Sequence, residues 1–537
     1  MAKQLENLLE PEELVEVGRL VDRLSRWTGA IPLGDPNMHL VEAAHAVGRG
    51  FTATLGRDEQ RAMGQFMTPP LIAKFMAKRL VAGFDHWHVR VLEPSAGAGI
   101  LAAAVLEALL AKQTPPERID LCLFEMDARL IPALRQVCEQ MREACAAAGV
   151  ALDWKIENND FLLSDLALSG QPVEGLLTIS NPPFFKLNKT TDERATLHAY
   201  AVYGQPNIYG LFMAACARLT ASSGRWCFIT PRSWMNGNYF KATRHTMLRH
   251  LTLDSMHAFE SRRDGFEEDA VLQEMVITWA TGRTTFEAGL NILLTRSQGI
   301  SDLDTGEVQA IPTTRMVADD EHAMFTLPAA GADPFEGWTS TLATYGLKVS
   351  TGPVVAFRAG KHIREAELPG TVPLLWLQHV GQQSISWPIR KKREHIKAVA
   401  ENAWQLVLNA PMVLMRRFSP KEDARRVTCA AYVGTLPGQV LGLENHLNYI
   451  YRPAGRMSHH EARGLSAFLA SSVVDLHFRA LAGSTQVNAT ELRKLPLPPL
   501  AVIEAIGRSV SERPSLEEID QVVTKALGVN EAQRLAA

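Results

Sequence analysis

A short apolar run that ends in two consecutive prolines constrains this chain more than any other feature. Residues 174–180 are mostly apolar, as in a buried strand, and Asn181-Pro182-Pro183-Phe184 follows at once. Because proline fixes φ and donates no backbone hydrogen bond, the strand must stop here. The residue before each proline is also kept out of the α region. We therefore expect a stiff, extended corner at the carboxyl end of a strand, where open α/β sheets place their ligands.

The corner presents groups that can make an amino nitrogen nucleophilic. The amide oxygen of Asn181 and the carbonyl of Pro182 can accept both hydrogens of an exocyclic NH2 group, and Phe184 offers a ring face to a planar partner. Two acceptors oppose the conjugation of that nitrogen with its ring and turn its lone pair outward, so no strong base is needed. An ordinary proline turn after a strand explains Asn-Pro-Pro alone about as well.

Strand-like and helix-like runs alternate before and after the corner, and this alternation indicates the fold class. The other strand-like runs are residues 89–92, 121–127, 154–161, 225–231, 252–259 and 269–280. Alternation with helices predicts a Rossmann-like α/β domain with a mostly parallel sheet. The last two runs predict an antiparallel end to that sheet.

The first strand runs into a glycine-rich turn, Glu93-Pro94-Ser-Ala-Gly97-Ala-Gly99, and an alanine-rich helix follows. The glycines allow a ligand to approach the backbone closely at the strand-to-helix turn. The spacing Gly97-x-Gly99-x-x-Ala102 also satisfies the dinucleotide fingerprint, so a dehydrogenase and a plain structural turn are both open interpretations. Glu93 would repel a phosphate and favour a ligand ammonium group.

Acidic residues follow the next two strands. Glu125 could bind ribose hydroxyls, and Asp160 could accept from an adenine amino group with Phe161 against the ring. A solvated strand end and an Asn-Asp turn are the plain alternatives. Thr68, which precedes two prolines, has the pattern of a helix N-cap and either begins a helix or aims its N-terminus at a carboxylate.

Composition bounds the compartment and the number of domains. A chain of 537 residues is expected to form two or three domains. Its six cysteines are scattered without a Cys-x-x-Cys pair, which favours a reducing compartment and argues against a zinc site or a disulfide frame. No apolar stretch reaches the length of a membrane span. We expect a cytoplasmic protein with no membrane contact and no metal site.

The charge distribution is more informative than the net charge of −3. Residues 340–500 hold 20 Lys/Arg and 10 Asp/Glu, so the remainder of the chain is acidic. Basic clusters occur at 390–393, 416–417 and 425–426. Single clusters are usually solvated faces, but several in one segment of an acidic chain favour a surface that contacts phosphates.

These patterns divide the chain into five parts. They are a helical N-terminal segment at 1–62, a catalytic domain at 63–285, a connecting region at 286–340, a polyanion-binding domain with α and β structure at 341–500, and a helical tail at 501–537.

Taken in order, the motifs Phe-Met-Thr-Pro-Pro, Glu-Pro-Ser-Ala-Gly-Ala-Gly, Phe-Glu-Met-Asp, Asn-Asp-Phe and Asn-Pro-Pro-Phe resemble those of the N6-adenine DNA methyltransferases. The order is that of the gamma arrangement, in which cofactor motifs precede the catalytic motif and the target-recognition domain comes last. TaqI-type and type II restriction-modification methylases are the members of this family that the chain resembles. The resemblance spans about residues 60–280 and extends more loosely over 345–500, where residues 483–488 and 495–498 resemble the end of a recognition domain.

The resemblance implies S-adenosylmethionine as cofactor and assigns a role to each motif. Its cofactor-binding set is Thr68, Glu93, Pro94, Gly97, Gly99, Glu125, Met126, Asp160 and Phe161. In this set Thr68 and the glycine turn would hold the amino-acid end, Glu93 would lie near the ammonium, and Met126 would pack on the adenine. The catalytic set is Asn181, Pro182, Pro183 and Phe184, with Phe184 stacked on the target base.

Double-stranded DNA is the implied partner, and a separately encoded restriction endonuclease is a candidate second partner. The implied activity is site-specific, adenine-specific DNA methylation by a modification enzyme or an orphan methylase. Methylation of another nitrogen, in RNA guanine or protein glutamine, is the alternative, because related enzymes use similar Asn-Pro-Pro-aromatic corners. A recognition subunit with a degenerate enzyme domain is a further alternative, although the intact corner and both cofactor acids disfavour it.

Overall fold

The computed structural model describes residues 39–528 apart from 53–66, 260–273, 284–289, 319, 329–334, 336, 391–392, 419–422, 482–486 and 488. The expected helical segment 1–62 is therefore described only at 39–52, where helix α3 (Leu40–Thr52) lies. Residues 269–273 of the last expected strand, 529–537 of the expected tail and most of the motif at 483–488 also lie outside the described residues. The chain forms two compact units, divided between Phe325 and Thr326.

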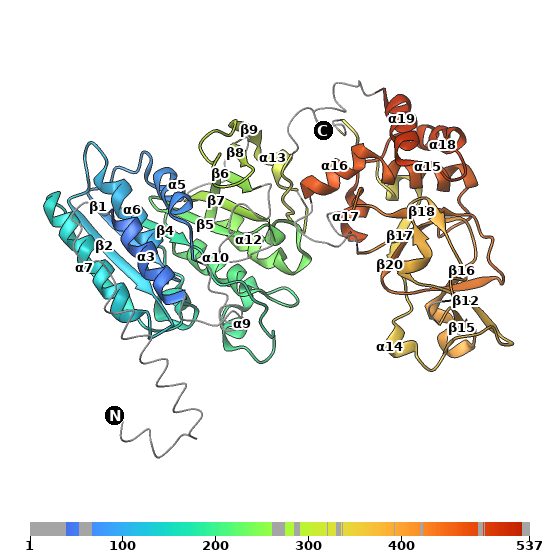
Figure 1. The fold of residues 1–537 in the computed structure, drawn as a ribbon, viewed down its shortest axis with the longest axis horizontal. Helices are drawn as coiled ribbons and strands as arrows, with labels where there is room; N and C mark the ends of the chain where they lie inside the picture. Colours follow the sequence, from blue (N-terminus) through green and yellow to red (C-terminus); the bar gives the residue numbers. More distant parts are fainter. Residues whose placement is uncertain are drawn as a thin grey trace, which may run out of the picture. The chain divides into compact units, whose positions relative to one another are not determined.

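The first unit is built on a nine-stranded sheet with the order β3-β2-β1-β4-β5-β7-β6-β8-β9 (Figure 1). The strands are β1 (His88–Glu93), β2 (Arg118–Phe124), β3 (Ala151–Glu157), β4 (Leu176–Ser180), β5 (Arg225–Pro231), β6 (Leu251–Phe259), β7 (Met275–Gly282), β8 (Asn291–Ser297) and β9 (Gln309–Pro312). The first five are parallel, and β7 inserts antiparallel between β5 and β6. The predicted parallel α/β domain is thus observed.

Helices cover both faces of this sheet because the strand order reverses between β1 and β4. Right-handed crossovers that lead outward in opposite directions place their helices on opposite faces. One layer holds α3, α5 (Pro70–Val81), α6 (Ile100–Leu110) and α7 (Ile131–Ala147), and the other holds α8 (Asp165–Ser169), α10 (Ile208–Leu219) and α12 (Lys241–His250). Short helices α9 (Glu193–Leu197), α11 (Ser233–Asn236) and α13 (Thr313–Met316) lie in the connections.

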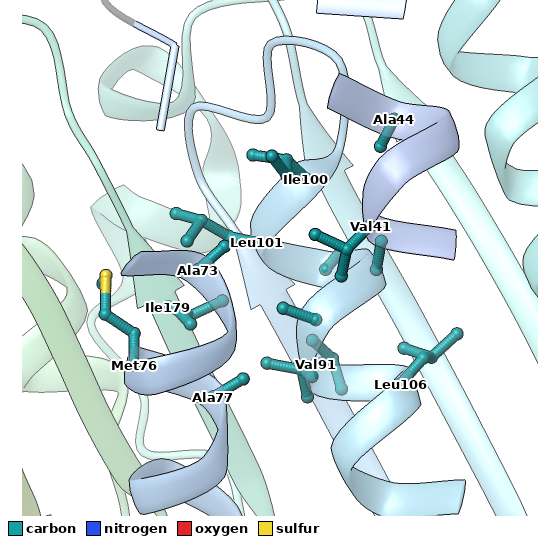
Figure 2. Packing of buried hydrophobic residues seen from close by; sticks show 14 of the residues in the cluster. Val41, Ala44, Ala73, Met76, Ala77, Val91, Ile100, Leu101, Leu106 and Ile179 are labelled. Carbon is teal, nitrogen blue, oxygen red and sulfur yellow. The ribbon is translucent and has the colours of Figure 1, made fainter. Parts of the chain in front are cut away.

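The main core of the first unit lies under the first helical layer. Figure 2 shows Val41 of α3 and Met76 of α5 packed with Leu101 of α6 above Val91 and Ile179 of the sheet. All five side chains are buried. The small residues of α6, Ala102, Ala103 and Ala104, are also fully buried. An alanine-rich helix lets two others approach closely, so the sequence of α6 explains why this layer is two helices deep.

The region from 286 to 325 is part of the first unit, which differs from the expected connecting region at 286–340. Strands β8 and β9 extend the sheet, with β8 parallel to β6 and β9 antiparallel to β8. The segment after β9 is held by Arg244 of α12, which donates to the carbonyl of His322 through Nε at 3.0 Å and Nη2 at 2.8 Å. Phe325 N donates to the carbonyl of Met235 at 2.8 Å. These attachments come from residues distant in sequence, so local composition could not reveal them.

The second unit contains a four-stranded sheet, β10-β20-β17-β18, and a five-stranded sheet, β11-β15-β12-β19-β16. Their strands are β10 (Lys348–Thr351), β11 (Ile363–Arg364), β12 (Thr371–Leu375), β15 (His395–Lys397), β16 (Leu406–Leu408), β17 (Met412–Arg416), β18 (Cys429–Tyr432), β19 (Val440–Leu443) and β20 (Leu447–Tyr451), and a hairpin joins β13 (Val380–Gly381) and β14 (Ser384–Ile385). The helices are α14 (Ala356–Ala359), α15 (His459–Ala470), α16 (Ser472–Leu481), α17 (Ala489–Lys494), α18 (Leu500–Ser509) and α19 (Leu516–Leu527). This is the mixed α and β content expected for residues 341–500.

The expected helical tail at 501–537 is an integral part of this second core as far as it is described. Ile503 and Ile506 of α18 and Ile519 and Val523 of α19 are fully buried in the same cluster as Phe468 of α15. Residues after 500 therefore complete the domain. Among the helices of the described residues, none is long and apolar enough to cross a membrane.

Candidate active site

The site lies where β1 and β4 are neighbours and the strand order reverses. Open α/β sheets bind ligands at this point, outside the carboxyl ends of the strands. Leu92 pairs with Thr178, so the turn after Glu93 and the corner after Ser180 begin at the same edge. Ser95 links them, because its Oγ lies 3.0 Å from Ser180 Oγ and donates to the carbonyl of Asn181 at 3.2 Å. The glycine turn and the proline corner thus form one structure.

The corner itself has the form that its sequence predicts. All five residues of β4 are buried, and the strand ends at Ser180. Pro182 is buried, whereas Asn181 and Phe184 are partly exposed at the sheet edge. The ring of Phe184 meets the edge of Tyr209 with centroids 5.9 Å apart, and Tyr209 stacks on Phe240 at 5.0 Å. This aromatic row packs against Phe184, and no spacing pattern in the sequence predicts it.

Thr68 orients the amide of Asn181. Asn181 Nδ2 donates to Thr68 Oγ1 at 3.1 Å, and Thr68 is buried. An amide that donates through its nitrogen on one side presents its oxygen on the other edge of the same plane. The predicted N-cap role of Thr68 is wrong, because α5 is capped by Pro69 without a side-chain hydrogen bond. The threonine hydroxyl instead accepts a hydrogen bond from the corner at Asn181.

The two glycines of the turn have different reasons for being glycine. Gly97 and Gly99 both have positive φ, of 54° and 79°. A Cβ on Gly99 would lie 2.8 Å from Leu134 Cδ1 of α7, so this glycine lets α6 pack on α7. Gly97 has room for a Cβ, but its backbone N–H donates to Glu125 Oε2 at 2.7 Å. The turn therefore reaches the acid at the end of the neighbouring strand.

Two buried carboxyl groups, of Glu93 and Glu125, lie at this turn. Glu93 is 1% exposed and accepts from Ala102 N at 2.9 Å, and Glu125 is 7% exposed and accepts from Asp127 N at 2.7 Å as well as from Gly97. Burial raises the pKa of Glu93 well above its ordinary value, and the charge of Glu125 raises it further. Burial also raises the pKa of Glu125. Such a pair favours a ligand that brings a positive charge and hydroxyl donors.

Met126 and Pro94 lie next to these acids in the chain and differ in solvent exposure. The side chain of Met126 is 61% exposed, as a residue that packs on a bound ring requires. Pro94 is buried within the turn. The exposed position of Met126 is compatible with its expected contact with a ligand.

Asp160 caps a short helix and pairs with a loop arginine. Its Oδ1 accepts from Leu162 N at 2.9 Å, and its Oδ2 lies 3.4 Å from Arg194 Nη1. The expected contact of Phe161 with a ligand ring disagrees with the structure, because Phe161 is 1% exposed. Its ring packs against Phe124 at 5.2 Å and Phe212 at 5.6 Å. Phe161 is a core residue, which the adjacent Asp160 could not indicate.

Several arginines of the basic clusters are buried or form contacts within the second unit. Arg426 is fully buried, and Arg425 pairs with Asp520 of α19. Arg416 Nε donates to the carbonyl of Val380. The side chain of Arg390 is exposed, and only the backbone N–H of this residue donates to the buried Glu394. A count of basic residues therefore overstates the charge that this unit presents to a partner.

Comparison with known proteins gives the class to which this geometry belongs. Residues 177–266 match the family described as Eco57I restriction-modification methylase. The type II methyltransferase M.BsuBI of Bacillus subtilis is 30% identical over 476 residues, which cover 86% of this chain and 92% of that protein. The chain therefore belongs to the type II methyltransferases of restriction-modification systems.

A second relative agrees. The type II methyltransferase M.PstI of Providencia stuartii is 29% identical over 488 residues, which cover 88% of this chain and 95% of that protein. Among solved structures, the DrdV–DNA complex is similar with a TM-score of 0.48 and 13% identity, covering 87% of this chain and 59% of that one. The relatives confirm the resemblance to type II restriction-modification methylases, and the dehydrogenase interpretation is excluded.

The hydrogen bond between Thr68 and Asn181 gives a first prediction. Replacing Thr68 with Val keeps the shape but removes the acceptor, so the amide of Asn181 loses its fixed orientation. Loss of one such bond costs about 1 kcal/mol, which corresponds to roughly a fivefold fall in the single-turnover methylation rate. Thr68→Ser should retain most of the rate. An unchanged rate in Thr68→Val at saturating cofactor and DNA would show that the bond has no positioning role.

The burial of Glu93 gives a second prediction. Because folding raises the pKa of this carboxyl, the folded state holds its proton more tightly than the unfolded chain does. The contribution of Glu93 to the free energy of unfolding must therefore fall as pH rises above about 4.5. Glu93→Gln keeps an acceptor for Ala102 N and removes this dependence. Urea unfolding of the cofactor-free protein at pH 5 and pH 8 should show the variant gaining stability relative to wild type at the higher pH, and parallel behaviour would contradict the assignment.

Proposed function

We propose that this protein transfers a methyl group from S-adenosylmethionine to N6 of an adenine that is flipped out of duplex DNA. The observation that carries the proposal is the corner at Asn181, whose amide is held in one orientation by Thr68 at the reversal of strand order. Beside it, Phe184 is supported by the aromatic row behind it. Membership in the type II methyltransferases supports the reaction class, and the chemistry of the corner supports an exocyclic amine as acceptor.

The acids of the glycine turn fit the cofactor. S-adenosylmethionine supplies an electrophilic methyl group on a positive sulfonium, together with an ammonium, ribose hydroxyls and an adenine ring. Glu93 would lie near the ammonium and Glu125 would bind the ribose hydroxyls, because both are buried acceptors at the same turn. Gly97 would give the amino-acid end close access to the backbone, with Pro94, Gly99 and Thr68 shaping the site. Met126 would pack on the adenine, and Asp160 would accept from its amino group.

The corner residues then act on the target base. An adenine inside a duplex cannot reach this edge, so it must be extruded into the site. Asn181 Oδ1 and the carbonyl of Pro182 would accept the two N6 hydrogens, and Phe184 would stack on the base, a contact worth about 1–3 kcal/mol. Holding N6 in this orientation turns its lone pair toward the methyl group, and positioning of this kind supplies much of the rate. The proton of N6 can leave after transfer, so no general base is required beforehand.

The second unit would bind the duplex and read its sequence. Its excess of basic residues supports contact with phosphates, although several arginines are engaged internally. Because the cofactor and catalytic motifs end before this unit begins, recognition and chemistry would be divided between the two units. The protein would then act as the modification enzyme of a restriction-modification system, with a separately encoded endonuclease as candidate partner, or as an orphan methylase.

Replacement of Asn181 tests the catalytic assignment. Asn181→Ala removes one of the two N6 acceptors and should lower turnover by at least about two orders of magnitude, since the loss of one preorganised polar contact at a reacting centre has that size. DNA and cofactor affinities should stay within a few-fold of wild type. Asn181→Asp keeps an acceptor and should retain measurable activity. Methyl transfer from labelled cofactor to DNA, with binding measured separately, checks this, and a near wild-type rate in Asn181→Ala would refute the role.

The identity of the product tests the proposed substrate. Nucleosides from DNA methylated by the purified protein should contain N6-methyladenine. The detection of N4-methylcytosine instead would overturn the adenine assignment while leaving the role of the corner intact. Base extrusion can be followed with 2-aminopurine at the target, whose fluorescence should rise on binding. Phe184→Ala should reduce this rise and the rate more than Phe184→Trp does, because only the latter keeps a ring for stacking.

A further inference from the structure

A basic hollow lies on the second helical layer of the first unit, apart from the corner. Its volume is about 440 Å³, and it opens between the C-terminal end of α10, the loop at 200–203 and α12. Three cations line it, Arg218, Lys241 and Arg249, together with the rings of Tyr200 and Tyr203. We call these five residues the α12 stripe. No acidic side chain lines the hollow within the part of the chain that the structure describes.

The two cations of the stripe that belong to α12 share one face of that helix. Lys241 and Arg249 lie eight residues apart, with His245 midway between them, so they share a face along about 12 Å of helix. The opposite face is buried through Arg244 and Met247. His245 and Arg249 are exposed, and Tyr200 and Tyr203 are 38% and 44% exposed. Charges and rings are therefore presented outward from a helix whose inner face is fixed.

The side chain of Arg218 is held in place without being neutralised. Its guanidinium lies over the ring of Tyr200, 4.5 Å from the centroid. It also lies on Gly170, where an added Cβ would be 2.1 Å from Arg218 Nη2. Within the described residues, neither Arg218 nor Arg249 forms a salt bridge. Lys241 lies 5.5 Å from the ring centroid of Tyr203 and 3.2 Å from Glu321, which is largely exposed.

The lysine end of the stripe is linked to the corner only through two buried rings. Phe184 meets Tyr209, Tyr209 stacks on Phe240, and Lys241 follows Phe240 directly in the chain. From Lys241 the helix runs toward Arg249, which lies just before β6 begins level with the start of β5, toward the amino ends of the strands. The arginine end of the stripe therefore lies away from the corner, on the outer helical layer. The cations lie in the methyltransferase unit and not in the basic second unit.

We propose that the α12 stripe binds phosphates of the DNA backbone away from the target base. The inference rests on the proposed function only in taking duplex DNA as the substrate, and it does not depend on which base is methylated. Phosphates along one strand recur with a rise of about 3.4 Å, so the 12 Å between Lys241 and Arg249 spans about three of them. Guanidinium groups bind phosphate oxygens in a bidentate manner, and arginine is the residue that is kept free here. The contact would position the duplex without reading its sequence.

The salt dependence of DNA binding tests the proposal. Each lost phosphate contact lowers the slope of log affinity against log salt by about 0.9. The double variant Arg218→Gln, Arg249→Gln should therefore lose about 1.8 from the slope for a long duplex, so the affinity gap from wild type should narrow about tenfold between 50 and 200 mM salt. The single variant Arg249→Gln, which alters an exposed side chain with no ring contact to lose, should lose about half of that slope.

A matched control separates this surface from general charge. Arg135→Gln with Arg142→Gln removes two exposed arginines from α7, on the opposite face of the sheet, and should leave the slope within about 0.3 of wild type. The stripe variants should lose the same slope on a duplex with no methylatable site, because phosphate contacts carry no sequence information. A different methylated base would thus refute the proposed function and leave this test standing. A wild-type slope in Arg249→Gln, or an equal loss in the α7 control, would overturn the proposal.

Discussion

The pairing of β1 with β4 is the constraint on which the first unit depends. At this pair the connections turn outward in opposite directions, so the helices must divide between the two faces and the carboxyl ends of both strands are left uncovered. Each strand places a stiff or glycine-rich turn at that edge, and Ser95 ties the two turns together. Every candidate catalytic and cofactor residue is positioned by this arrangement, either from the turns themselves or from an element packed against them.

Polar groups in the site are held in place by hydrogen bonds to one another. The amide of Asn181 is bound by Thr68, and the two oxygens of Glu125 accept backbone N–H groups of Gly97 and Asp127. Buried acceptors that are satisfied internally cost little to maintain, whereas unsatisfied ones would destabilise the turn. A ligand that binds Glu125 must therefore share or replace existing hydrogen bonds, which favours a ligand with matching donors.

The sequence allowed the corner, the glycine turn and the parallel sheet to be predicted, because their causes are local. Two prolines stop a strand wherever they occur, and a glycine at positive φ marks a turn. The partners of Thr68 and Phe161 could not be predicted in this way. Thr68 bonds a residue 113 positions away, and Phe161 packs on rings from two other elements. Strands β8 and β9 were not predicted from the sequence for the same reason, since strands in a polar region are recognised by the strands with which they pair.

The attachment of residues 313–325 to the first unit bears on how recognition could be exchanged between relatives. A chimera joined near residue 285 would leave behind β8 and β9 and expose the edge of β6, whose residues Met256, His257 and Ala258 are buried. It would also remove the carbonyl of His322, which accepts from Nε and Nη2 of the fully buried Arg244, and so leave these two donors unpaired. Joining after Phe325 keeps both. If the second unit reads the sequence as proposed, the module to transplant begins some 40 residues after the expected end of the catalytic domain at 285.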